Sequence, residues 1–234
     1  SIYFMNKNIY VPLMFLLLTF ISCEIVDTKI NPFYIDVVGK LRDAIEYEIK
    51  DKNLNAISIA ILKQNDFFWA EGFGYTDEDK KIKADENTIY RVGSVSKLFT
   101  DIAIMKKRES GDIDIDLPIQ NYLPKFNPKN IFNNEPITLR QLMSHRAGIL
   151  REPAYGNYFA DNETSLEKTV ESVSNSSLIH PPGTITKYSN AGIAVVGYTL
   201  EKIFRKPYVE FMQENILNPL NMNASSFEFK NSMS

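Results

Sequence analysis

Residues 91–100 have the sequence RVGSVSKLFT, in which Ser94 stands three residues before Lys97. A strand-like run at residues 88–92 precedes the serine. After it, apolar residues recur at the spacing of one helix face: Val95, Leu98, Phe99, Ile102 and Met105. Gly111 marks the expected end of this helix. We therefore expect Ser94 in the first turn, with Lys97 one turn on and on the same side.

This spacing has two interpretations. A serine hydroxyl is a weak nucleophile until a base removes its proton, and Lys97 can be that base if desolvation or positive charge lowers its pKa. The helix N-terminus would also stabilise negative charge on Ser94. The alternative is a capped helix with a surface lysine, because S-x-x-K often arises by chance.

Further motifs follow in a fixed order along residues 36–228. They are GFGY at 72–75, YRVGSVSK at 90–97, ESGDIDIDLP at 109–118, NYLP at 121–124, LRQLMSHRAGI at 139–149, PPGT at 181–184, YSNAG at 188–192 and PLNM at 219–222. This pattern resembles the serine β-lactamase and penicillin-binding protein superfamily, in its class C β-lactamase-related branch. The resemblance implies an α+β, β-lactamase/transpeptidase-like fold, with an antiparallel sheet packed against a mainly helical region.

The resemblance also implies a serine hydrolase that forms an acyl-enzyme on amide, lactam or ester bonds, as in D-Ala peptides, β-lactams or small esters. Ser94 would attack, Lys97 and Tyr188 would move protons, and Asn190 would orient substrate. A phenol with a usual pKa of about 10 can do this only beside a cation such as Lys97. Taken alone, Y-x-N is weak, and the other interpretation is a buried tyrosine followed by an N-cap at Asn190.

No cofactor and no metal site are expected, because the two histidines have no ligand spacing. The resemblance places His145 in a structural segment, where Arg146 and Ala147 replace the commoner Thr-Ser. His180 is expected in a loop. The alternation of acid and isoleucine at residues 112–116 indicates a half-buried extended segment rather than a cation site.

The remaining elements follow from periodicity and turn residues. We expect a helix at 34–51, strands at 56–62 and 67–75 joined by a turn at 64–66, and a charged loop at 76–87. Further helices should begin at residues 138 and 164 with capping boxes, and a last one should run from Asn190 to just before Pro207. Residues 155–162 form a loop that either lines a cleft rim or covers the core.

The N-terminal residues have the features of an exported lipoprotein. An apolar run at 9–21 is followed by Ser22 and by Cys23, the sole cysteine, in a lipobox-like sequence. We expect a signal peptide at 1–23, a tether at 24–33 and a catalytic domain at 34–234, lipid-anchored through Cys23 at the periplasmic or outer face of a bacterial membrane. An ordinary signal peptide with an incidental cysteine is the alternative. The net charge of −3, without a basic run, does not favour nucleic-acid partners.

The superfamily's third motif, Lys or His followed by any residue and Gly, has no counterpart before Ser234. Its strand would supply an oxyanion-hole N–H, whose loss can cost about 10²–10³ in rate. We expect a domain truncated at its C-terminal side, with an exposed sheet edge and poor turnover. A second hypothesis is a non-catalytic envelope lipoprotein that binds peptide or peptidoglycan in the same cleft.

Overall fold

The computed structural model describes residues 34–63, 66–77, 79, 81–132, 135–157 and 165–228. The chain divides into two compact units, Ser1–Thr88 and Ile89–Ser234. Cys23 and the leader and tether expected at residues 1–33 lie outside the described residues. Within the described ranges, every helix is too short or too polar to cross a bilayer.

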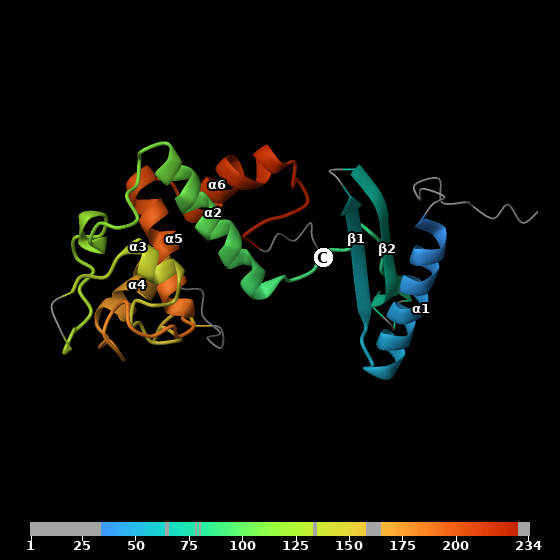
Figure 1. The fold of residues 1–234 in the computed structure, drawn as a ribbon, viewed down its shortest axis with the longest axis horizontal. Coiled ribbons are helices and arrows are strands. Elements are labelled where there is room, and N and C mark those ends of the chain that lie inside the picture. Colours follow the sequence, from blue (N-terminus) through green and yellow to red (C-terminus); the bar gives the residue numbers. More distant parts are fainter. Residues whose placement is uncertain are drawn as a thin grey trace, which may run out of the picture. The chain divides into compact units, whose positions relative to one another are not determined.

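The first unit consists of one helix and an antiparallel sheet with the order β1-β2-β3 (Figure 1). The elements are α1 (Ile35–Asp51), β1 (Ala56–Lys63), β2 (Asp66–Asp77) and β3 (Ile82–Lys83). The predicted helix and hairpin are confirmed. The loop predicted at residues 76–87 is wrong in part, because β2 continues to Asp77 and β3 pairs with it despite the charged sequence.

One face of α1 packs on the hairpin and forms the core of this unit. Val38, Trp69 and Phe73 are buried, and the Trp69 and Phe73 rings meet edge to face at 6.3 Å. Partly buried side chains complete the cluster: Tyr34, Leu41, Ile45, Ile49, Ile59 and Ile61. A sheet face needs such a cover, because a hairpin alone is at best marginally stable in water.

The second unit is helical and is organised around α5. Its elements are η2 (Gly93–Val95), α2 (Ser96–Glu109), η3 (Ile119–Asn121), α3 (Leu139–Met143), α4 (Leu166–Ser174), α5 (Asn190–Phe204), α6 (Tyr208–Met212), η4 (Gln213–Leu217, a π-helix) and η5 (Asn218–Leu220). Helix α5 contacts α2, α3, α4 and α6. It is apolar around most of its circumference, as expected of a helix buried on all sides.

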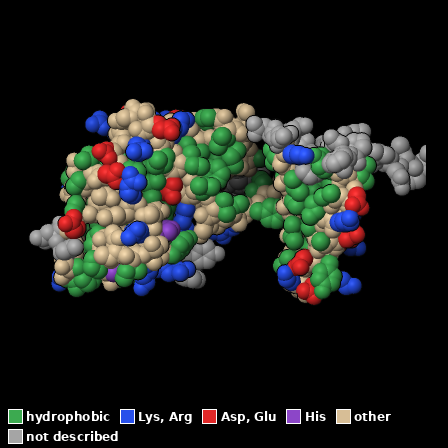
Figure 2. Space-filling model, viewed as in Figure 1, with side chains coloured by type: hydrophobic (Ala, Val, Ile, Leu, Met, Phe, Trp, Pro, Cys, Tyr) green, Lys and Arg blue, Asp and Glu red, His purple; other side chains and the backbone are tan. Residues whose placement is uncertain are grey.

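Helix α2 packs on this core with the face opposite to its apolar stripe. Its buried residues are Thr100, Ala103 and Ile104. Four residues of the predicted stripe are exposed instead: Val95, Leu98, Ile102 and Met105. Figure 2 shows hydrophobic side chains on the surface over this helix. The strand-like run at residues 88–92 is irregular, so the prediction of a strand there is wrong.

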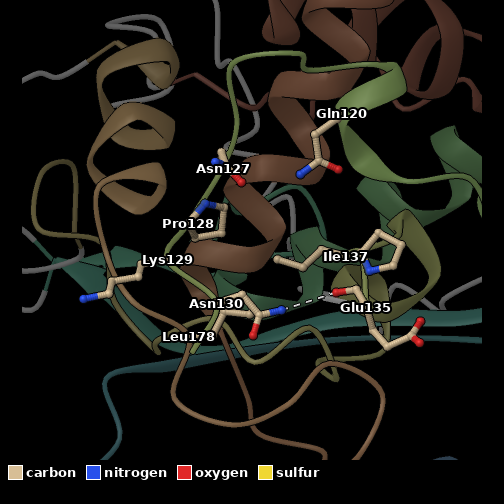
Figure 3. A pocket seen from close by; sticks show the side chains of 9 residues that line it. Gln120, Asn127, Pro128, Lys129, Asn130, Glu135, Ile137 and Leu178 are labelled. Carbon is tan, nitrogen blue, oxygen red and sulfur yellow. Dashed lines mark hydrogen bonds between the residues drawn. The ribbon is translucent and has the colours of Figure 1, made fainter. Parts of the chain in front are cut away.

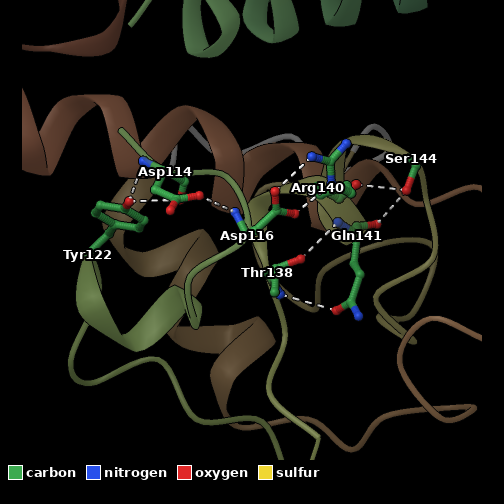
Figure 4. A network of polar contacts seen from close by, with 7 residues as sticks. All are labelled: Asp114, Asp116, Tyr122, Thr138, Arg140, Gln141 and Ser144. Carbon is green, nitrogen blue, oxygen red and sulfur yellow. Dashed lines mark hydrogen bonds and ion pairs between the residues drawn. The ribbon is translucent and has the colours of Figure 1, made fainter. Parts of the chain in front are cut away.

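A polar network holds the segment before α3 in place (Figure 4). Ile113 and Ile115 are buried and the neighbouring acidic residues exposed, so the predicted half-burial is confirmed. The prediction of an extended segment is wrong in part, because residues 115 and 116 form a turn in which the Asp116 N–H donates to Asp114 Oδ1 at 2.9 Å. Asp116 accepts two hydrogen bonds from Arg140, at 2.5 and 2.7 Å. Helix α3 begins with the predicted capping box of Thr138 and Gln141.

Candidate active site

Three of the predicted site residues lie together in the second unit. Tyr188 Oη is 2.6 Å from Ser94 Oγ, and Lys97 Nζ donates to the same Oγ at 3.1 Å. Ser94 and Tyr188 are 94 residues apart in the sequence. The contact therefore depends on the packing of α2 against α5, which brings the start of each helix to one place.

Ser94 lies in the 3-10 turn that precedes α2 and is exposed to solvent. Gly93 has φ +53°, a left-handed conformation that suits glycine and turns the chain into this helix. The N-cap residues, Val92 of η2 and Val95 of α2, make no side-chain cap hydrogen bond. The positive end of the α2 dipole thus stands beside a serine that solvent can reach.

Tyr188 is surrounded by positive and aromatic groups. Lys97 Nζ lies 5.0 Å from the centroid of its ring, and Arg151 Cζ lies 5.3 Å from it. The ring of His145 is tilted against it, with centroids 4.6 Å apart. Burial alone would raise the pKa of Tyr188, but hydrogen bonds to Lys97 and Ser94 and the charges of Lys97 and Arg151 outweigh burial. The pKa of Tyr188 is therefore lowered.

Asn190 is the first residue of α5, and the interpretation that it caps the helix is wrong. The N-cap is Ser189, whose Oγ accepts the N–H of Gly192 at 2.8 Å. The Asn190 side chain instead donates from Nδ2 to Glu152 Oε1 at 2.6 Å. The capping residue and the candidate substrate-binding residue are thus neighbours with separate contacts.

His145 has contacts that agree with the structural role expected for it. Its Nδ1 accepts the backbone N–H of Ser189 at 3.3 Å, and its backbone has φ +59°. Burial, followed by the charge of Lys97, lowers the pKa of His145, which favours the neutral ring needed for that hydrogen bond. His180 lies in a loop as predicted, but it is buried.

The sequence interpretation missed Arg151 and Glu152. Both come shortly after the buried run at residues 147–149, with the half-buried Leu150 between. Two adjacent residues of opposite charge, placed where the chain leaves the core, are the feature of the sequence that could have identified them. Of the loop predicted at 155–162, Tyr155 is exposed and residues 158–162 lie outside the described part.

An open depression of about 400 Å³ lies elsewhere on the second unit (Figure 3). Polar side chains form much of its lining, and Asn130 Nδ2 donates to the backbone oxygen of Glu135 across it at 3.4 Å. None of Ser94, Lys97, Tyr188 and Asn190 lines it. The catalytic hypothesis therefore depends on the Ser94 cluster and not on this depression.

Known proteins are similar to this chain in sequence. The Staphylococcus aureus protein named "Protein flp" is 28% identical over 190 residues, which are 81% of this chain and 38% of that protein. "Beta-lactamase-like protein 2" of Dictyostelium discoideum is 31% identical over 96% of this chain and 44% of its own length. The chain thus spans less than half the length of these relatives.

Solved structures agree with this likeness. The octameric penicillin-binding protein homologue from Pyrococcus abyssi is 32% identical with a TM-score of 0.72, over 83% of this chain and 45% of that one. A class C β-lactamase at 18% identity has a TM-score of 0.74, over 87% of this chain and 54% of that one.

A small antiparallel sheet with many helices, matched by these structures, defines the β-lactamase/transpeptidase-like α+β fold that the sequence predicted. The family model described as Beta-lactamase matches residues 41–233. The chain belongs to the Beta-lactamase family.

Proposed function

We propose that the protein containing this chain is a serine hydrolase that works through an acyl-enzyme on Ser94. The observation that carries the proposal is the hydrogen-bonded cluster of Ser94, Tyr188 and Lys97. A nucleophile within hydrogen-bond distance of a base, with a third group beside the base, is the arrangement that activates a hydroxyl.

The contacts support a division of roles. Ser94 Oγ would attack a carbonyl carbon while its proton passes to the Tyr188 oxygen at 2.6 Å, and Lys97, donating to Oγ, would stabilise the charge there. The proton then goes to the leaving nitrogen or oxygen as its bond to the carbonyl carbon breaks. Water, activated by the same tyrosine, releases the acid and restores Ser94. Asn190 would hold the substrate.

The substrate class is proposed as an amide, lactam or ester. Structures with the same fold carry the titles "EstCE1, a hydrolase with promiscuous acyltransferase activity" and, from Yersinia pestis, "Beta-lactamase/D-alanine Carboxypeptidase". Those titles describe proteins 24% and 22% identical to this chain, so they support the range of acyl substrates and do not choose among them.

The test is covalent labelling of the full-length protein. We expect a fluorescent penicillin or an activated p-nitrophenyl ester to add one acyl group, and peptide mapping by mass spectrometry to place it on Ser94. Ser94→Ala should remove the adduct. Ser96→Ala is the matched control, a serine two residues on at the same helix end, and should label like the wild type. No adduct with either probe would favour the binding-protein hypothesis instead.

We also propose export and lipid attachment at Cys23, supported by the apolar run and the position of the sole cysteine. Cells fed a labelled fatty acid should incorporate it into the wild-type protein and not into Cys23→Ser. Label-free wild-type protein in the medium would contradict the anchor, while leaving the hydrolase proposal intact.

A further inference from the structure

The backbone of residues 150–152 holds the start of α5. Leu150 O accepts the hydroxyl of Ser189 at 2.6 Å. Arg151 O accepts two backbone N–H groups, from Asn190 at 2.8 Å and from Ala191 at 3.1 Å. The first N–H groups of a helix have no partner within it, so this segment satisfies two of them and locks the helix start in place.

The side chains of the same segment contact two of the candidate site residues, Tyr188 and Asn190. The Arg151 guanidinium lies over the Tyr188 ring, and Glu152 Oε1 accepts from Asn190 Nδ2. Arg151 Nε lies 3.5 Å from that Glu152 oxygen. Two consecutive residues therefore contact both Tyr188 and Asn190, from the side chains as well as the backbone.

We propose that Arg151 and Glu152 are positioning residues of the active site, with Arg151 favouring the phenolate of Tyr188 and Glu152 fixing the amide of Asn190. A carboxylate only accepts hydrogen bonds, so it selects the NH₂ end of the amide and leaves Oδ1 and one N–H to a substrate. The catalytic meaning rests on the proposed function, whereas the two contacts can be tested without any activity.

Four groups face Tyr188 from the elements around it. Lys97 from α2 and Arg151 from the loop are cationic. Ser94 shares a hydrogen bond with the phenol, and the neutral His145 ring packs on it. Glu152 partly offsets Arg151. At separations of about 5 Å in a water-like dielectric, one unit charge moves a pKa by about 0.5 to 1. The two charges of the segment should therefore act on Tyr188 with opposite signs.

The first experiment measures the Tyr188 pKa directly in the full-length protein. Tyrosine labelled with ¹³C at Cζ is titrated by NMR, and Tyr188→Phe assigns the signal. We expect Arg151→Gln to raise the pKa by about 0.5 to 1, Arg151→Lys to restore most of it, and Glu152→Gln to lower it slightly. Lys187→Gln, at the exposed neighbour of Tyr188, is the matched charge control and should shift it less. Equal shifts in Arg151→Gln and Lys187→Gln would overturn the role of Arg151.

The second experiment follows the Asn190 side-chain NH₂ by ¹⁵N NMR, assigned with Asn190→Asp. We expect Glu152→Ala to speed hydrogen exchange of the bonded amide proton at least fivefold, and Glu152→Gln, which keeps an oxygen acceptor, to preserve protection. Unchanged exchange in Glu152→Ala would overturn the role of Glu152.

Acylation then separates this inference from the proposed function. If Ser94 is acylated, Arg151→Gln should shift the pH–rate profile of acylation to higher pH, by the same amount as the Tyr188 pKa. Glu152→Ala should slow acylation about fivefold to tenfold. If Ser94 is not acylated in the wild type, the proposed function fails, and the two NMR results still decide whether Arg151 and Glu152 position Tyr188 and Asn190.

Discussion

The candidate site joins the starts of two helices that are built in opposite ways. At α2, the start has no side-chain cap, Gly93 has open space around it, and Ser94 is exposed. At α5, Ser189 caps the helix and is buried, and Gly148, two residues before the segment 150–152 that holds this helix start, is crowded by backbone. The two starts meet at the hydrogen bond between Ser94 and Tyr188.

The two helix starts therefore have different roles: the α2 start presents a reactive group, and the α5 start holds other groups in place. An uncapped, exposed helix start leaves the serine hydroxyl available to a reacting carbonyl. A capped, buried start fixes a tyrosine and an asparagine at set positions. Loss of the Ser94 hydroxyl at α2 should therefore change chemistry more than stability, and loss of the Ser189 cap at α5 should change stability more.

The largest expected effect is that of Ser94→Ala on acyl transfer. The loss should be about 10³-fold or more, because no other nucleophile stands at that position. The free energy of unfolding should change by less than about 0.5 kcal/mol, since the residue is exposed. Steady-state kinetics and urea unfolding check the two halves. A large loss of stability would contradict the contrast between the helix starts.

The next effect distinguishes two glycines in left-handed conformations. A Cβ on Gly148, at φ +76°, would lie 2.2 Å from the backbone oxygen of His180. We expect Gly148→Ala to cost more than about 3 kcal/mol, because backbone must shift. Gly93, at φ +53° with nothing within 4 Å of a Cβ, should cost only about 1–2 kcal/mol as alanine.

Urea unfolding of the full-length variants measures both glycine substitutions. Equal losses in Gly148→Ala and Gly93→Ala would show that backbone conformation alone, without the crowding at His180, accounts for the cost.

A smaller effect is expected from the caps. Ser189→Ala removes the acceptor for Gly192 N–H and the donor to Leu150 O, which should cost about 1–3 kcal/mol. Ser96→Ala at the start of α2 is the matched control, and it should cost less than about 0.5 kcal/mol because Ser96 is not the cap. If the two substitutions cost the same, the α5 start is not the better anchored one.

The smallest effect concerns Asp101, one turn beyond Lys97 on α2. Burial raises its pKa from 3.8 to about 6, and its Oδ1 is buried without a hydrogen-bond partner in the described structure. The folded state then holds the proton more tightly, so stability should fall as pH rises from about 4 to about 6 and level off above. Asp101→Asn should remove this slope and add about 1 kcal/mol at pH 7.

Thermal melting between pH 4 and pH 8 measures the Asp101 effect. If Asp101→Asn keeps the wild-type fall in stability between about pH 4 and pH 6, a group other than Asp101 takes up the proton.

Local patterns predicted much of the fold. Helical spacing located α1 and α2, turn residues located the β1–β2 hairpin, and the acid–isoleucine alternation at residues 112–116 predicted which side chains are buried. These predictions succeed because side-chain period follows directly from backbone geometry. The apolar stripe of α2 was the exception, since periodicity identifies a face and not the neighbour that covers it.

The sequence by itself determined the family and the candidate chemistry, because S-x-x-K and Y-x-N each keep their functional atoms within a few residues. Only the tertiary structure decided which cations surround Tyr188 and that Ser189 rather than Asn190 caps α5. It also decided that Arg151 contacts Tyr188 and that Glu152 contacts Asn190. The contacts of Leu150 with Ser189 and of Glu152 with Asn190 join residues 39 and 38 positions apart. Their geometry depends on the packing of α3 and α5 and on the loop between them, and no local spacing records it.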